Sequence, residues 1–275
     1  MGRIATPPMG PYAKWMQSFL DISTRAFDLL ETLIQPEIVD RNSLARRVIY
    51  DLSLHAEATS IAARVALTYS LSVPAFALAR VRLEQCIVAS FLIHAPEDEG
   101  MSRYLFHIPI QLFKAVQKHE KHFQTDKDLS FLEQRAAEAQ QALVGAQFRE
   151  AKFERHWTQL ELSKMAEQRD VIAAAKLGIP WRLEDDYWKF YPLASLAVHS
   201  AGDAMLFAGG MHEPELFSGQ KYPYTQPDRA RALAGAVARY DVIQCAEALA
   251  RLGIAKLADV LPLIERHDAE IERDA

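Results

Sequence analysis

One segment, residues 73–94, constrains the fold most, because its apolar side chains surround the whole circumference of a predicted helix. They belong to Val73, Phe76, Leu78, Val81, Leu83, Ile87, Val88, Phe91 and Leu92. A helix that is apolar on every side is stable in water only when other helices cover it. The segment therefore predicts the central helix of a helical bundle.

The rest of the chain also predicts helices. Only 11 of the 275 residues are glycine, and the helix-breaking residues cluster between long segments of helical periodicity. We predict helices at residues 11–36, 43–70, 73–94, 98–122, 127–150, 154–177, 192–209, 228–252 and 254–273. No segment alternates between apolar and polar residues as a strand would. We expect an all-α fold, a single irregular multi-helix bundle over residues 1–275, with a core at 43–210 on which helices at 228–273 pack.

Composition and charge exclude several classes of protein. The formal net charge of −5 argues against a dedicated nucleic-acid-binding protein, which would be strongly basic. No uninterrupted apolar run is long enough to span a membrane. Cys86 and Cys245 both lie inside apolar helical patterns, where a disulfide framework is not expected. We therefore expect a cytoplasmic protein without a membrane partner.

Known cofactor motifs are absent from the sequence. It contains no phosphate-binding loop, dinucleotide fingerprint, nucleophile elbow or HExxH motif. His119 and His122 lie near the end of a predicted helix, where the helix dipole favours cations, and no further zinc ligands accompany them. We therefore expect no cofactor and no metal. His55 follows Asp51 by four residues beside an apolar stripe, which predicts a core histidine capped by that carboxylate.

The predicted central helix carries charged residues in its apolar surface. Arg80 and Glu84 are four residues apart, hence on one face, and Arg82 lies on a neighbouring face. A buried guanidinium or carboxylate is tolerable chiefly as a hydrogen-bonded pair. Arg80 and Glu84 are therefore either an ion pair that fixes helix packing or the lining of a pocket that meets a ligand.

A second group of polar residues follows Tyr191. Pro192 suits the first position of the helix predicted at 192–209, which leaves Tyr191 extended before it. Ser195, His199 and Asp203 then follow at four-residue spacing along one side. A nucleophilic triad is one interpretation, but a helix provides neither a strained, exposed serine nor oxyanion donors. The simpler interpretation is a histidine whose ring nitrogens are satisfied by local partners.

These residues resemble an uncharacterised bacterial all-helical family of unknown function. The resemblance covers roughly residues 45 to 210, from the Arg80-x3-Glu84 helix, through Ser102-Arg103-Tyr104, to Tyr191-x3-Ser195-x3-His199. It implies that Arg80, Glu84, Tyr191, Ser195 and His199 meet in the fold. It implies no particular activity.

The chain is more loosely similar to the helical ribonuclease-toxin (HEPN-like) superfamily, whose signature separates an arginine from a following histidine by four to six residues. Arg149-x6-His156 matches this spacing, whereas His199 has no arginine at that distance upstream. That resemblance implies that His199 would move protons at an RNA 2′-hydroxyl, while Arg80 or Arg82 would stabilise the charge on phosphorus. Candidate binding residues are Arg82 together with Arg103, Tyr104 and His107, which precede a helix break expected at Pro109.

Two functions remain open. The first is a non-catalytic interaction or regulatory module that self-associates as a homo-oligomer, with its polar clusters fixing the core. The alternative is a metal-independent ribonuclease-type or nucleotide-directed effector of the toxin or defence kind, with RNA or a nucleotide as its ligand.

Overall fold

The computed structural model describes nine stretches of the chain. They are residues 12–34, 44–69, 71–95, 100–123, 128–145, 160–177, 181–198, 227–253 and 257–272. The helices in these stretches are α1 (Tyr12–Ile34), α2 (Leu44–Thr68), α3 (Ser72–His94), α4 (Met101–Phe123), α5 (Ser130–Gly145), α7 (Leu162–Leu177), α8 (Leu183–Val198), α11 (Pro227–Arg251) and α12 (Leu257–Glu272). These stretches contain no strand. The predicted all-α class is confirmed.

The chain divides into two compact units. The first comprises residues 1–94 and 162–275, with α1, α2, α3, α7, α8, α11 and α12, and the second comprises residues 95–161, with α4 packed on α5. The prediction of one domain over the whole chain remains a prediction. No described helix is long and apolar enough to cross a bilayer.

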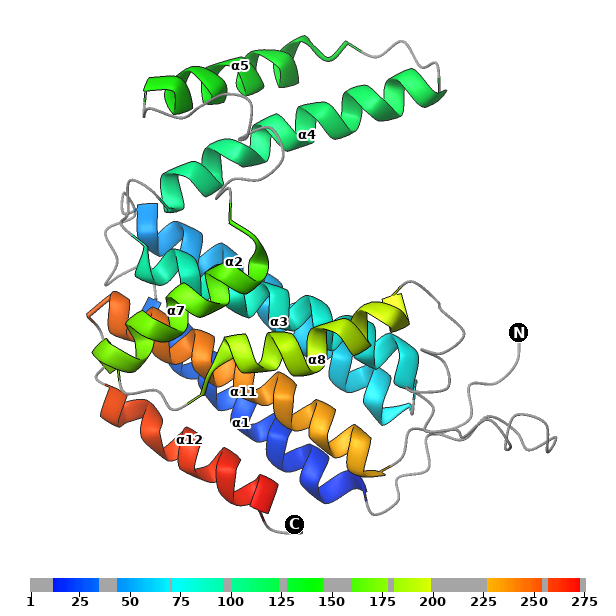
Figure 1. Cartoon of the computed structure of the whole chain (residues 1–275), viewed down its shortest axis with the longest axis vertical. Coiled ribbons are helices and arrows are strands. Elements are labelled where there is room, and N and C mark those ends of the chain that lie inside the picture. Colours follow the sequence, from blue (N-terminus) through cyan, green and yellow to red (C-terminus); the bar gives the residue numbers. More distant parts are fainter. Residues whose placement is uncertain are drawn as a thin grey trace, which may run out of the picture. The chain divides into compact units, whose positions relative to one another are not determined.

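Helix α3 is central in the first unit, as its apolar circumference predicts. It packs against α2, α7, α8 and α11 (Figure 1). Small buried residues such as Ala75, Ala79 and Ala89 bring neighbouring backbones close, and Leu83 and Ile87 fill the space between the helices.

A second helix, α11, is as deeply enclosed as α3. It packs against α1, α2, α3 and α12, and every residue from 240 to 249 is buried. Three polar residues, Asp241, Gln244 and Glu247, lie within this buried stretch at intervals of three. The core between α3 and α11 is therefore where charged groups have to be paired.

A helix boundary predicted at Pro192 and a helix break predicted at Pro109 were wrong. Helix α8 begins at Leu183, so Pro192 lies inside it and Tyr191 is helical rather than extended. Pro109 likewise lies inside α4. A proline removes one backbone donor from a helix interior, and surrounding packing can outweigh that loss. The helix predicted at 228–252 ends as expected, with Gly253 just beyond it at a φ of 65°.

Candidate functional site

Arg80 and Arg82 lie on opposite sides of α3 and meet different surroundings. Two residues correspond to a rotation of about 200° around a helix. The Arg80 side chain is 17% exposed and lies toward α8, whereas the Arg82 side chain is completely enclosed toward α11. One helix therefore supports a half-buried polar cluster on one side and a buried ion pair on the other.

The half-buried cluster consists of Arg80, Glu84 and Tyr191. Arg80 Nε donates to Glu84 Oε1 at 3.0 Å, and Nη2 donates to the Tyr191 hydroxyl at 2.9 Å. The guanidinium also lies 4.6 Å from the centre of the Tyr191 ring, within the range of a cation–π interaction. The structure thus brings together three of the five residues expected to meet.

Two stacked aromatic pairs flank this cluster, one within α8 and one between α8 and α3. Tyr187 stacks on Tyr191 with ring centres 4.7 Å apart, and Phe76 of α3 stacks on Phe190 at 5.9 Å. Ser195 is half-buried one helical turn after Tyr191. His199 and Asp203 lie outside the described residues, so the meeting of His199 with this cluster remains a prediction.

The buried ion pair joins α3 to α11 and α2. Arg82 Nε lies 2.8 Å from Asp241 Oδ1 and 3.2 Å from the Ser60 hydroxyl, and Nη2 donates to the Tyr240 carbonyl at 3.0 Å. Ser60 itself donates to Asp241 Oδ1 at 2.6 Å. Charged hydrogen bonds of this kind offset the cost of taking both ions out of water.

Some polar atoms around this pair have no partner among the described protein atoms. They include Arg82 Nη1, Asp241 Oδ2 and Gln244 Oε1, all deeply buried. Arg64 Nη1 also has no partner among these atoms. Burial lowers the pKa of the Arg64 guanidinium, although the negative charges of Asp241 and Glu57 raise it in part. The desolvation cost of the Arg82–Asp241 pair is therefore only partly compensated.

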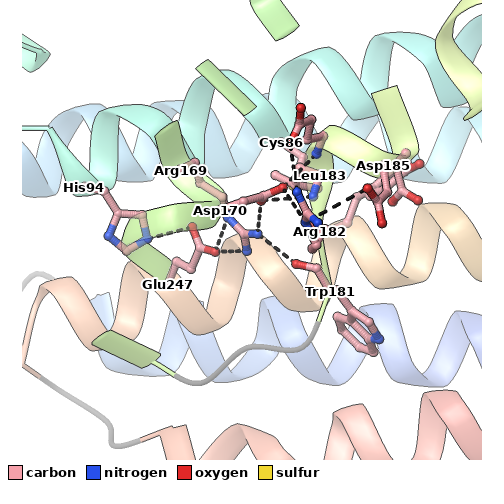
Figure 2. Close-up of polar contacts among 12 residues, drawn as sticks. Cys86, His94, Arg169, Asp170, Trp181, Arg182, Leu183, Asp185 and Glu247 are labelled. Atoms are coloured by element: carbon pink, nitrogen blue, oxygen red, sulfur yellow. Dashed lines mark hydrogen bonds and ion pairs between the residues drawn. The ribbon is translucent and has the colours of Figure 1, made fainter. Parts of the chain in front are cut away.

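A second buried ion pair joins α7 to α11. The Arg169 guanidinium lies between Glu247 and Asp170 (Figure 2): its Nε and Nη2 both donate to Glu247 Oε1, the former at 2.8 Å. Its Nη1 donates to Asp170 Oδ1 at 2.7 Å and to the Trp181 carbonyl at 2.9 Å. The side chains of Arg169 and Glu247 are almost fully enclosed. This network fixes α7, the start of α8 and α11 to one another.

Glu247 also meets His94 at the end of α3. His94 Nε2 lies 3.2 Å from Glu247 Oε2, although the two are not aligned for a hydrogen bond. Burial alone would raise the pKa of Glu247, but Arg169 and His94 outweigh it and hold that pKa below its usual value. A lowered carboxyl pKa stabilises the fold above the unfolded-state pKa, and that stabilisation is lost as pH falls through the folded-state pKa. The pair therefore contributes fully at neutral pH.

Asp170 explains why α8 begins at Leu183. Its Oδ1 accepts the backbone N–H of Leu183 at 3.0 Å, and its Oδ2 accepts that of Glu184 at 2.9 Å. Free N–H groups in the first turn of a helix need such acceptors, and a negative charge there also interacts favourably with the helix dipole. A residue of α7 thus caps α8.

Replacing Asp170 by alanine is expected to lower the free energy of unfolding by about 2 kcal/mol, because two backbone donors and Arg169 lose an acceptor. Asparagine, which keeps one acceptor oxygen, should cost less. Asp185→Ala removes a half-exposed carboxylate from the same turn and serves as the control, with an expected loss below about 1 kcal/mol. Urea denaturation followed by circular dichroism measures all three; equal losses for Asp170→Ala and Asp185→Ala would contradict the capping role.

The other predicted residues belong to different helices of the described chain. Arg103, Tyr104 and His107 are half-buried on α4, in the unit of residues 95–161, where His107 Nε2 lies 2.9 Å from Gln111 Nε2. The prediction of a core histidine at position 55 was wrong, because both His55 and Asp51 are exposed. Among the described residues, no three histidine, cysteine, aspartate or glutamate side chains are grouped to hold a metal ion.

Sequence reasoning missed the carboxylates that pair with the buried arginines. Asp241 and Glu247 lie in a predicted helix rich in alanine and leucine, and the criterion applied to Arg80 and Glu84 would have selected them too. Arg169 and Asp170 gave no such signal, because α7 has weak apolar periodicity and their partners lie in other helices.

One family model matches this chain. A family described as a family of unknown function (DUF5677) matches residues 48–215, which is more than half of the chain. The matched region includes Arg80, Glu84 and Tyr191, whereas α11, with Asp241 and Glu247, lies outside it. No curated protein and no solved structure matches the chain. None of these comparisons supports the likeness to ribonuclease toxins.

Proposed function

We propose that this chain, which belongs to the family of unknown function DUF5677, is a non-catalytic helical interaction or regulatory module that self-associates. One observation carries the non-catalytic part: the guanidinium groups of Arg80, Arg82 and Arg169 are already engaged by groups of the same chain. Each of these contacts joins different elements or successive turns, which is what a packing role requires.

A catalytic role would require these arginines to have hydrogen-bond donors available for a ligand. An arginine that stabilises a developing negative charge has to present free donors to the reacting group. Arg82 and Arg169 are fully enclosed, and Arg80 directs Nε and Nη2 to Glu84 and Tyr191. These contacts favour scaffolding over ribonuclease-type or nucleotide-directed chemistry.

Self-association is supported by the surface of α2. This helix exposes several large apolar side chains, among them Leu54, Ile61 and Val65. Contiguous exposed apolar surface of more than a few hundred Å² is uncommon on a monomer and marks an interaction site. A module that acts by association would present such a surface.

The proposal is tested at Arg80. We expect Arg80→Ala to lower the free energy of unfolding by about 1 kcal/mol, because the cluster is half-buried and partly screened by solvent. Tyr191→Phe, which keeps the ring but removes the hydroxyl, should cost about half as much. Arg25→Ala, at an exposed position on α1, is the control and should cost nothing measurable in the same urea denaturation.

Two outcomes would contradict a non-catalytic role. One is an Arg80→Ala variant with unchanged stability that has lost an RNA-cleaving or nucleotide-hydrolysing activity present in the wild type. The other is a His199→Ala variant that likewise keeps its stability but loses such an activity. Each would mean that these side chains act on a ligand rather than on helix packing.

A further inference from the structure

The outward face of α2 is apolar over five turns. Its large side chains are half-exposed: Tyr50 43%, Leu54 48%, Ile61 47%, Val65 51% and Tyr69 43%. Ala58 is exposed between them, and the Tyr69 N–H donates to the Val65 carbonyl at 3.1 Å, which continues the helical path. We call Tyr50, Leu54, Ala58, Ile61, Val65 and Tyr69 the α2 stripe.

The α2 stripe is not needed for the core of its own unit. The opposite side of α2 carries the residues that pack inward against α3 and α11, including Val48, Leu52, Ala56, Ala63 and Leu67. The stripe itself contains no charged residue, and the exposed charges nearest to it, Arg47 and Asp51, lie beside its first turn. An uncharged apolar row of this length is expected to be covered by a partner.

The spacing of the α2 stripe indicates what that partner is. Successive members are separated by four, four, three, four and four positions, an order that is the same in both directions along the helix. A second copy of α2 laid antiparallel therefore places Tyr50 opposite Tyr69, Leu54 opposite Val65 and Ala58 opposite Ile61. A two-fold symmetric interface requires this arrangement, because each surface contacts an identical surface: if residue i contacts residue j of the other copy, then j contacts i.

We propose that two copies of this chain associate through antiparallel α2 helices, about a two-fold axis between positions 59 and 60. This inference rests on the proposed self-association and adds its surface, register and stoichiometry. Because each copy uses the same face, the assembly closes at two chains. The apolar area buried by both copies is roughly 1,000 Å², near the lower limit for a specific interface, so we expect reversible association.

The first experiment measures mass by sedimentation over the micromolar range. Wild type should change from one chain to two as concentration rises, and Leu54→Glu/Ile61→Glu should remain at one chain. Val171→Glu is the matched control, because Val171 is an apolar residue of α7 that is 70% exposed outside the stripe; it should dimerise like the wild type. Circular dichroism verifies that each variant is folded, as expected for exposed positions.

The second experiment tests the register with disulfides. Chains carrying Leu54→Cys are mixed with chains carrying Val65→Cys, and the mixed disulfide dimer should exceed either homodimer. Val171→Cys controls for random collision. The native thiols should not compete, because Cys86 and Cys245 are buried and burial raises the pKa of Cys86 to about 12.

The outcomes separate the two proposals. If wild type remains a single chain at all concentrations, self-association fails, and the proposed α2 interface fails with it. If wild type forms dimers that Leu54→Glu/Ile61→Glu does not dissociate, or that preferentially cross-link Leu54→Cys to itself, self-association stands and the antiparallel α2 interface is overturned.

Discussion

Replacing Glu247 by alanine is expected to lower the free energy of unfolding by about 3–5 kcal/mol. The substitution leaves the Arg169 guanidinium enclosed without the carboxylate that accepts from its Nε and Nη2, and it removes the charge beside His94. A buried charge that loses its partner costs far more than a surface ion pair contributes. Urea denaturation at pH 7 measures the change.

Two further variants separate the ion pair from mere loss of volume. Arg169→Met combined with Glu247→Leu replaces both charges with apolar groups and should recover part of the lost stability, because no enclosed guanidinium is left without Glu247. Asp170 loses its Arg169 donor in this variant but keeps the backbone N–H groups of Leu183 and Glu184. Glu167→Ala removes an exposed carboxylate of α7 that pairs with Lys164, and its expected cost is below about 1 kcal/mol. A Glu247→Ala effect no larger than that of Glu167→Ala would contradict the structural role of the pair.

Replacing Arg82 by methionine is expected to have a comparable effect, about 3–5 kcal/mol. Asp241 would then be a fully enclosed carboxylate that keeps the Ser60 hydroxyl as a hydrogen-bond donor but has lost its charged partner. The Tyr240 carbonyl would also lose the Nη2 donor that links α3 to α11. We expect both the midpoint and the cooperativity of urea unfolding to fall, as judged by circular dichroism.

The double variant Arg82→Met/Asp241→Leu tests whether this pair stabilises the fold or only avoids an unpaired charge. Arg82 Nη1 and Asp241 Oδ2 have no hydrogen-bond partner among the described protein atoms, so part of the desolvation cost is uncompensated in the wild type. We therefore expect the double variant to be about as stable as the wild type, or more so. Additive losses from the two single substitutions would show instead that each residue stabilises the fold independently.

The two buried pairs also bear on where the folding unit ends. Arg82 and Arg169 lie within the region matched by the family model, but Asp241 and Glu247 lie beyond it on α11. A chain restricted to residues 48–215 would contain both buried arginines without these carboxylates. In this protein, α11 therefore belongs to the same packed core as the matched helices.

Much of the helical architecture follows from the sequence, because helix periodicity is local. Apolar residues on every side of 73–94 predicted an enclosed helix, and α3 is enclosed by four others. The four-residue spacing of Arg80 and Glu84 predicted their contact, which the structure places at 3.0 Å. The start of α8 was not predictable in this way, because its cap comes from Asp170 of another helix.

What the sequence alone determined is which residues lie on which face of each helix, since that depends only on 3.6 residues per turn. It could identify charges in apolar surroundings, but not their partners. Arg82 meets Asp241 across 159 positions and Arg169 meets Glu247 across 78. Those pairings depend on how helices distant in sequence pack together. Only the tertiary structure therefore decided that Arg82 is buried in an ion pair while Arg80, two residues away, is half-buried beside Tyr191.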